Sequence, residues 1–390
     1  MKRTAVLAAA ILVDLLLGLT GTASASTAAL STAAGHGHRA DRVCAAAPAG
    51  YASCQALVRT DATGVPTVTT APAGYGPADI VSAYALGAAS SGGRTVAIVD
   101  AYDDPTAEAD LNSYRTTYGL PACTSVNGCF RKVGQTGAAL PRVNASWAQE
   151  ISLDLDMVSA ACPDCKILLV EAKSASFADL GTAVNYAATQ NVTAISNSYG
   201  GSDSAASPAY NHPGIAITAS TGDGGYGVES PASYLTVIAV GGTSLTKAGN
   251  ARGWAEAAWS GAGSGCSTLN SKPAWQPSAT GCAGKANADV SAVADPNTGV
   301  AVYDSTAYKG SKGWMVFGGT SASSPIIASV YALSGNTPDY PASYTWAHPG
   351  NLNDITTGSN GTCSTSIWCT AGAGWDGPTG LGTPNGTGGF

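Results

Sequence analysis

Charged side chains are scarce in this sequence. Only 11% of the 390 residues are Asp, Glu, Lys or Arg, whereas 45% are hydrophobic. This composition excludes a disordered polyampholyte and provides enough apolar residues for the core of one sizeable globular domain. No basic run follows Arg3, and the net charge is -7. Nucleic acid and anionic membrane surfaces attract clustered Lys and Arg, so neither is expected as a partner.

Long hydrophobic runs are also missing, except at the N-terminus. Residues 1–25 contain a basic start at residues 2–3, an apolar stretch over residues 5–19 and the small-x-small sequence Ala23-Ser24-Ala25. This pattern is typical of a signal peptide and predicts a secreted protein, with an uncleaved anchor as the alternative because Asp14 interrupts the apolar stretch. No later segment approaches the ~20 apolar residues of a membrane span. We expect a monomer that does not associate with membranes.

The ten cysteines occur as five pairs, and the two members of each pair are close together in the sequence. An even count in an exported chain predicts five local disulfides. The expected pairs are Cys44–Cys54, Cys123–Cys129, Cys162–Cys165, Cys266–Cys282 and Cys363–Cys369. The Cys162-Pro163-Asp164-Cys165 segment has a redox or zinc half-site as its alternative, but no second such segment and no nearby histidine accompany it.

The chain divides into three parts by composition. After residues 1–25, residues 26–74 are rich in Ala, Gly, Thr and Pro with little periodicity, which is typical of a short prosegment or N-terminal extension. Residues 75–390 form the predicted domain. Strand-like runs are expected at 95–100, 166–171, 193–199, 214–219 and 235–240, and helices at 106–118, 145–161 and 177–189. This alternation predicts an α/β fold with a doubly wound, mostly parallel sheet flanked by helices, and a site at the carboxyl ends of the strands.

One serine lies where glycines lead into an apolar helix. Gly318-Gly319-Thr320-Ser321 precedes apolar residues at helical spacing. Such a turn exposes the hydroxyl and places it near the positive end of a helix dipole, as a nucleophile requires. The alternative is an ordinary serine or threonine cap on a buried helix.

Histidine, the usual base for a serine nucleophile, is nearly absent. The chain has four: His36 and His38 lie in the extension, and His212 and His348 each precede proline in loop-like sequence. None is a good centre for a Ser-His-Asp triad.

Carboxylates are the next candidates for the base. Glu150 and Asp154 are four residues apart and share one face of the helix predicted over 145–161, among apolar neighbours. Burial and like charge should raise at least one pKa and allow a shared proton. A solvated acidic stripe is the alternative. A separate candidate site residue is Asp223, a glycine-flanked acid that follows a strand-like run at the expected active edge of the sheet, with an Asx turn as its alternative.

Together these segments resemble the sedolisins, a family of serine-carboxyl peptidases with a subtilisin-like fold. Gly319-Thr320-Ser321-Ala322 resembles the nucleophile motif, and Glu150 to Asp154 resembles the paired-carboxylate helix. Thr221-Gly222-Asp223 is similar to the segment that carries the oxyanion-hole aspartate. Asp100 stands where the family usually has a glutamate that extends the carboxylate network, and Tyr199 stands where tryptophan is common.

The resemblance also implies a calcium site near the C-terminus. Asp354-Ile355 and Gly372-Ala373-Gly374-Trp375-Asp376 resemble the segments that supply two carboxylates and backbone carbonyls to Ca²⁺. The ligands would be Asp354, Ile355, Gly372, Gly374 and Asp376. A pair of surface turns is the alternative.

The function implied is that of a secreted, acid-acting endopeptidase that hydrolyses proteins or peptides through an acyl-enzyme. Ser321 would attack, Glu150 would take its proton, Asp154 would orient Glu150, and a protonated Asp223 would donate to the oxyanion. These roles predict an optimum in the range of about pH 3 to 5.5.

Other functions remain open. One is a neutral subtilisin-like protease that uses His212 or His348, and another is a non-catalytic binding protein on the same fold. An esterase is disfavoured because no G-x-S-x-G sequence surrounds Ser321.

Overall fold

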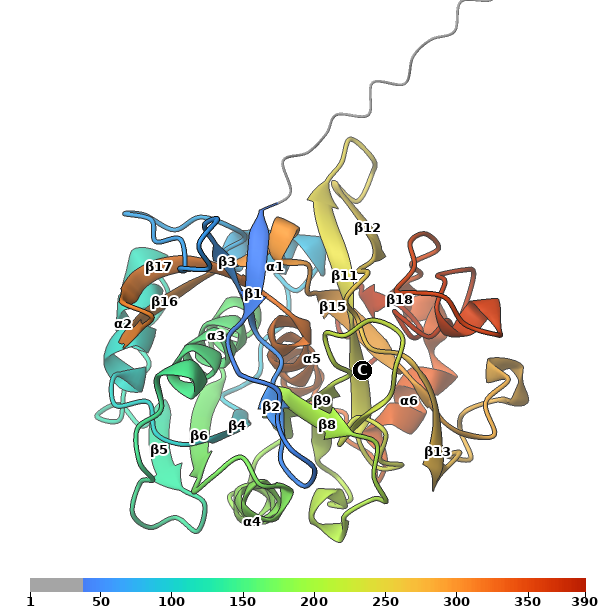
Figure 1. The fold of residues 1–390 in the computed structure, drawn as a ribbon, viewed down its shortest axis with the longest axis horizontal. Coiled ribbons are helices and arrows are strands. Elements are labelled where there is room, and N and C mark those ends of the chain that lie inside the picture. Colours follow the sequence, from blue (N-terminus) through green and yellow to red (C-terminus); the bar gives the residue numbers. More distant parts are fainter. Residues whose placement is uncertain (1–37) are drawn as a thin grey trace, which may run out of the picture. The chain divides into compact units, whose positions relative to one another are not determined.

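The computed structural model describes residues 38–390, which form one compact unit. The signal peptide predicted over residues 1–25 lies outside the described residues. A central sheet runs in the order β12-β11-β9-β7-β4-β6-β5, with β15 also paired to β11 (Figure 1). Its strands are β4 (Thr95–Ala101), β5 (Phe130–Gly134), β6 (Lys166–Ala172), β7 (Ala194–Asn197), β9 (Ala216–Ser220), β11 (Ile238–Lys247), β12 (Trp254–Ala258) and β15 (Val290–Val293). All pairs are parallel except β11 with β12.

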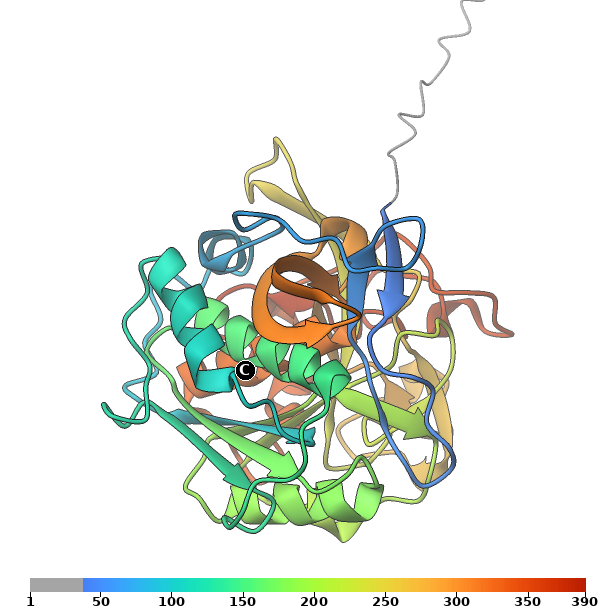
Figure 2. The ribbon, with the colours of Figure 1, turned by 60° about the vertical axis from the view of Figure 1, so that its left-hand side comes forward.

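Helices cover both faces of this sheet. They are α1 (Pro77–Ala83), α2 (Ala107–Thr117), α3 (Ala145–Ala161), α4 (Phe177–Ala188), α5 (Thr320–Ser334) and α6 (Pro341–Ala347). Helices α3 and α5 pack against each other and against the sheet, while α4 packs along the opposite face (Figure 2). The predicted mostly parallel α/β fold is therefore confirmed.

One predicted strand is divided. The strand expected over 193–199 ends at Asn197, and β8 (Tyr199–Ser202) leaves the central sheet to pair with β2 (Ser53–Cys54) and β10 (Glu229–Ser230). The break at Ser198 directs the following backbone away from the sheet. An edge is thereby formed at the carboxyl end of β7, where doubly wound folds bind ligands.

The extension predicted over residues 26–74 contains ordered strands. β1 (Arg39–Arg42) and β3 (Leu57–Thr60) join β16 (Val300–Tyr308) and β17 (Ser311–Gly318) in the order β1-β3-β17-β16. Residues 38–74 thus belong to the same compact unit as the predicted domain. The sequence of residues 38–74 has no clear hydrophobic period. Its strand β3 pairs locally with β1 and also with β17, about 260 positions later.

The remaining strands lie towards the C-terminal half. They are β13 (Gly265–Ser271) paired with β14 (Gly284–Asn287), and β18 (Leu352–Asn353) paired with β19 (Thr383–Pro384). Among the described residues, no helix is long and apolar enough to cross a membrane.

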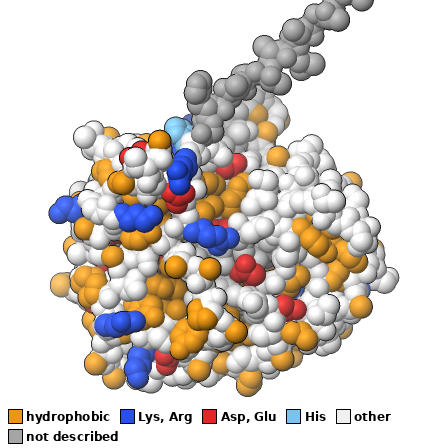
Figure 3. Space-filling view, viewed as in Figure 1, with side chains coloured by type: hydrophobic (Ala, Val, Ile, Leu, Met, Phe, Trp, Pro, Cys, Tyr) orange, Lys and Arg blue, Asp and Glu red, His pale blue; other side chains and the backbone are white. Residues whose placement is uncertain are grey.

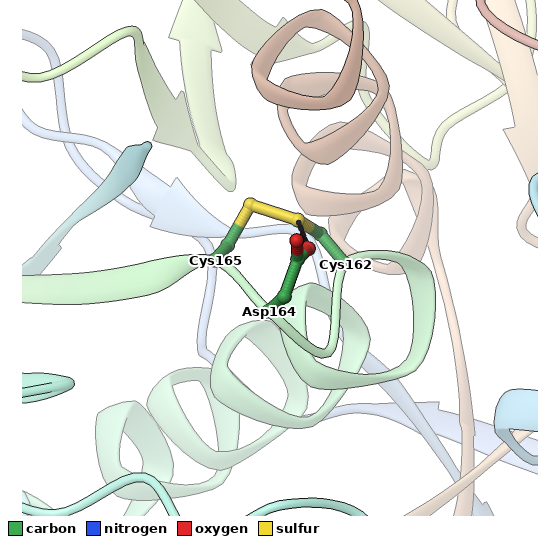
Figure 4. Close-up of side chains that lie close together, drawn as sticks. All are labelled: Cys162, Asp164 and Cys165. Atoms are coloured by element: carbon green, nitrogen blue, oxygen red, sulfur yellow. Dashed lines mark hydrogen bonds between the residues drawn. A yellow bond between two sulfur atoms is a disulfide. The ribbon is translucent and has the colours of Figure 1, made fainter. Parts of the chain in front are cut away.

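All five predicted disulfides are present. Cys162 and Cys165 join just after α3, beside Asp164 (Figure 4). Asp164 accepts hydrogen bonds from the hydroxyl of Ser90 and the backbone N–H of Ser91. Because both sulfur atoms are bonded to each other, this segment offers no thiolate for zinc.

Few charges cover the surface. On the face shown in Figure 3, acidic and basic side chains are interspersed among uncharged atoms. This distribution agrees with the low charge content of the sequence.

Candidate active site

The candidate nucleophile Ser321 lies in the first turn of α5. Gly319, which precedes this helix, has a φ of 94°, a conformation that favours glycine. A Cβ at Gly319 would also collide with the carbonyl oxygen of Gln55 and with Oδ2 of Asp223. Only glycine fits this position, and the chain turns there so that Ser321 meets the groups at the carboxyl edge of the sheet.

Helix α3 carries the carboxyl groups of Glu150 and Asp154 and packs against α5, the helix that carries Ser321. The Asn144 side chain caps its N-terminus by accepting from the N–H groups of Ser146 and Trp147. Every residue from 147 to 161 is buried, because α3 packs against α5, β4 and β16. Glu150 and Asp154 are fully buried, so the solvated acidic stripe considered from the sequence is wrong.

Hydrogen bonds join these groups through Ser198. The Ser198 hydroxyl donates to Asp154 Oδ1 at 2.8 Å, and the Ser321 hydroxyl donates to the Ser198 carbonyl at 3.1 Å. Both Glu150 oxygens have no close hydrogen-bond partner among the described residues. The Ser321 hydroxyl nevertheless lies near enough to lower the pKa of Glu150.

Asp100, at the end of β4, completes a cluster of three buried acids. Neither of its oxygens has a partner within the part of the chain that the structure describes. Burial raises the pKa of Asp100 to about 8 and raises the pKa values of Glu150 and Asp154 well above their usual range. The charges of Asp154 and Asp100 raise the pKa of Glu150 further. Three such groups cannot all ionise, so they must retain shared protons.

Asp223 lies on the other side of the nucleophile, after β9. Its Oδ1 accepts hydrogen bonds from the N–H and hydroxyl of Thr320 at 2.7 and 2.8 Å. Its Oδ2 is buried and lacks a partner within residues 38–390. Burial raises the pKa of Asp223 to about 6. Below that pH, Oδ2 can carry a proton and act as a hydrogen-bond donor.

The histidines lie elsewhere. His212 Nε2 contacts the carbonyl of Ala209 at 3.1 Å, and His348 Nδ1 contacts the carbonyl of Tyr344 at 2.8 Å. Neither has Ser321 among its hydrogen-bond partners. His36 lies outside the described residues.

The C-terminal segments at residues 354–355 and 372–376 carry oxygen atoms that are suited to hold a cation. Asp376 is fully buried, and burial together with Asp354 raises its pKa to about 7. Gly372 and Gly374 donate their N–H groups to Asp376 and Asp354 at 3.1 and 2.9 Å, which brings the two acids together. Within residues 38–390, the carbonyls of Ile355, Gly372 and Gly374 accept no hydrogen bond. In the described part of the chain, neither acid forms an ion pair with a basic side chain. Carboxylate and carbonyl oxygens of this kind are the ligands that Ca²⁺ prefers.

A second acidic cluster was missed in the sequence. Oxygens of Asp104, Asp110 and Asp304 lie within 4.8 Å of one another, and all three residues are buried. Burial raises the pKa of Asp104 to about 6 and that of Asp304 to about 8. Asp304 comes from β16, so no local spacing links it to the other two.

Comparison with known proteins identifies the family. Residues 136–359, more than half of the chain, match the subtilase family model. The chain belongs to the subtilase family. Kumamolisin from Bacillus sp. (strain MN-32) is 30% identical over 365 residues, covering 82% of this chain and 63% of kumamolisin. Sedolisin from Pseudomonas sp. (strain 101) is 34% identical over 178 residues, covering 40% of this chain and 29% of sedolisin.

These relatives confirm the resemblance to sedolisins drawn from the motifs. The chain spans less than two thirds of the length of either relative. The solved structure of Pseudomonas sedolisin, described as a serine-carboxyl proteinase complexed with two molecules of pseudo-iodotyrostatin, has a TM-score of 0.65 at 24% identity. It covers 80% of this chain and 96% of that one, and it shows that the chain has the subtilisin-like fold.

Proposed function

We propose that the chain is a secreted serine-carboxyl endopeptidase that cleaves proteins or peptides in acid. The observation that carries this proposal is the position of Ser321 between the buried pair Glu150 and Asp154 on one side and the buried Asp223 Oδ2 on the other. Buried carboxyl groups without partners cost stability, and such groups cluster at functional sites.

The reaction begins at the serine. Ser321 Oγ attacks the scissile carbonyl while Glu150 accepts its proton. Asp154 shares this proton and is itself held by the Ser198 hydroxyl at 2.8 Å. Asp100 supports the pair as a third member of the cluster. The proton then passes to the leaving amine, and water hydrolyses the acyl-enzyme.

Charge develops on the former carbonyl oxygen. The backbone N–H of Ser321 and a protonated Asp223 would donate to this oxyanion. An ionised Asp223 would repel it, so the rate should fall as the pH rises through about 6. An acid optimum follows.

Calcium has a structural role in this proposal. Asp354, Asp376 and the carbonyls of Ile355, Gly372 and Gly374 would hold the ion. A bound Ca²⁺ would supply the positive charge that the buried Asp376 lacks. The chain beyond residue 352 would then be held to the domain more firmly.

Secretion rests on the sequence pattern of residues 1–25 and on the five disulfides, which persist in oxidising compartments. A monomer is proposed as the exported form.

The test measures hydrolysis of a denatured protein from about pH 3 to 8. Wild type is compared with Ser321→Ala and Glu150→Gln, and Ser113→Ala and Glu108→Gln on α2 are the matched controls. We expect a peak in acid, two inactive variants and two active controls. A neutral peak that survives Glu150→Gln would favour a histidine base, which His212→Gln and His348→Gln would then identify. Absence of turnover at every pH would favour a binding protein.

A further inference from the structure

The N-terminal strap, residues 39–60, runs through the candidate active site. Its strand β2 pairs antiparallel with β8, and its strand β3 pairs antiparallel with the end of β17, immediately before α5. Figure 1 shows the strap in blue, with β2 beside β8. Ser321 is wholly buried beneath it. The strap therefore crosses the nucleophile in the extended form in which peptides add to a sheet edge.

Gln55 lies between the two strands of the strap. Its N–H donates to the Ser198 carbonyl at 3.1 Å, and its own carbonyl accepts the N–H of Ser321 at 3.2 Å. The same carbonyl oxygen and Asp223 Oδ2 both border the position of a Cβ at Gly319. The Gln55 carbonyl thus occupies the place where the proposed reaction stabilises an oxyanion.

The side chain of Gln55 enters a polar pocket. Its amide nitrogen donates to Glu229 Oε2 at 2.6 Å, and Arg42 donates to its amide oxygen at 3.1 Å. Glu229 lies against Gly200 and Gly222, where a Cβ would collide with its carboxyl group. The pocket is therefore shaped around Glu229, which recognises a side chain that donates a hydrogen bond. A cavity of about 510 Å³ beside Gln55 leaves room for longer donors such as Lys and Arg.

We propose that the Gln55–Ala56 peptide bond is a substrate of this active site, and that Glu229 selects the Gln55 side chain. This proposal rests on the proposed function. Ser321 Oγ bonds to the Gln55 carbonyl carbon, and its proton moves to Glu150. The bond from that carbon to the Ala56 nitrogen breaks as this nitrogen takes the proton. Water then hydrolyses the Gln55 ester, leaving a carboxylate on Gln55, a free amine on Ala56 and Ser321 regenerated.

The intact strap also keeps other substrates out. Residues 53–56 are buried and cover the nucleophile. Cys44 and Cys54 pair within the strap, on the same side of the Gln55–Ala56 bond, so no disulfide would hold the fragment after cleavage. Cleavage followed by dissociation would open the site, which makes the strap an internal inhibitor.

The experiment uses the full chain, purified near neutral pH and shifted to about pH 4, below the range in which Asp223 ionises. Intact mass and N-terminal sequencing follow the strap, and hydrolysis of an added denatured protein follows activity. We expect a new N-terminus at Ala56 in wild type and none in Ser321→Ala. Activity should appear after a lag that ends as the new N-terminus accumulates.

Three results would overturn the proposal. Hydrolysis of the added protein while Gln55–Ala56 stays intact would refute it and leave the proposed function standing. A new N-terminus elsewhere, for example near residue 75, would do the same. If wild type cleaves neither its own strap nor the added protein, the proposal and the proposed function both fail.

Glu229 is tested by Gln55→Glu, with Gln190→Glu as the matched control away from the cleft. The charged and titratable groups around residue 55 are Glu229, Asp223 and Arg42. Burial raises the pKa of Glu229 to about 7. In acid, the carboxyl group introduced at position 55 can therefore still share a proton with Glu229, and two carboxylates would repel each other only as the pH rises through about 7. The ratio of wild-type to Gln55→Glu processing rates should rise at least about tenfold from about pH 5 to about pH 8, which is about 1.4 kcal/mol. Adding Glu229→Gln should restore the rate; a flat ratio would exclude Glu229 as the selecting group.

Discussion

Asp289 and Glu150 are both fully buried carboxylates, but their surroundings differ. Asp289 forms a buried ion pair with Lys285 at 2.8 Å, and its two oxygens also accept from Ala239, Gln276 and Trp346. Glu150 has no close hydrogen-bond partner among the described residues and has two other acids beside it. The ion pair and hydrogen bonds of Asp289 offset the cost of burying its charge, whereas buried carboxyl groups without partners cluster at functional sites. The comparison therefore separates an ion-paired carboxyl group from the one proposed to act in catalysis.

The largest expected effect is the loss of catalytic activity in the Glu150→Gln variant. Loss of the proposed base should lower kcat by about 10²- to 10⁴-fold. The melting temperature should not fall, because the neutral amide removes a group whose ionisation is opposed by burial. Initial rates and thermal melts on the same preparation measure both quantities. Lost stability with retained activity would reverse the comparison.

Asp289→Asn should show the opposite behaviour. Lys285, only 1% exposed, would be left without its counter-charge, which should cost about 3–5 kcal/mol of unfolding free energy. Denaturant unfolding measures this loss, and Asp339→Asn at an exposed position is the control. Activity per folded molecule should not change. A loss below about 1 kcal/mol would mean that the ion pair contributes no more than an exposed one.

Asp376 is an intermediate case, because a cation would satisfy it. Calcium at about 100 times its Kd should raise the unfolding free energy by about 2.7 kcal/mol, and a chelator should remove that gain. Asp354→Asn should abolish the calcium-dependent part, while Asp339→Asn should retain it. If melting is independent of calcium in wild type, the proposed ion site is wrong.

The buried acids with raised pKa values predict an unusual pH dependence of the unfolding free energy. Burial raises the pKa values of Asp100 and Asp304 to about 8 and of Glu171 to about 9, well above their values in an unfolded chain. Between about pH 4 and 8 the folded protein therefore binds more protons than the unfolded chain, and the unfolding free energy falls as the pH rises. Each such proton contributes up to about 1.4 kcal/mol per pH unit. Unfolding of Ser321→Ala across this range avoids self-digestion; greater stability at about pH 8 than at about pH 4.5 would contradict this prediction.

The smallest expected effect is a change in the pH profile of Asp223→Asn. An asparagine amide donates without needing a proton, while its oxygen can still accept from Thr320. The decline in activity through about pH 6 should move upward. A profile with the wild-type alkaline limit would show that another group sets that limit.

The sequence predicted the parts of the site that have local signals. Glu150 and Asp154 share one helix face, and Ser321 follows glycines at the start of α5. The five disulfides were also accessible, because their partners are at most 16 residues apart. In each case a short stretch of sequence contains the whole pattern.

The parts that were missed depend on distant pairing. Gln55 meets Glu229 across 174 positions, and the strap's strands β2 and β3 pair with the distant strands β8 and β17. Asp304 joins Asp104 and Asp110 in the same way. Neither composition nor periodicity indicates such partners, since each half of the contact is ordinary by itself.

The pairing of β1 with β3 spans the Gln55–Ala56 bond: Arg39 to Arg42 align with Thr60 to Leu57. Hydrolysis would therefore leave both new chain ends aligned at a high effective concentration. Re-formation of the peptide bond would then compete with dissociation of the N-terminal fragment. The lifetime of the β1–β3 pairing, rather than the cleavage step, would therefore limit the rate of activation. Changes at Arg39 to Asp41, which lie in β1 outside the Gln55 pocket, would therefore alter the rate of activation without touching the proposed catalytic groups.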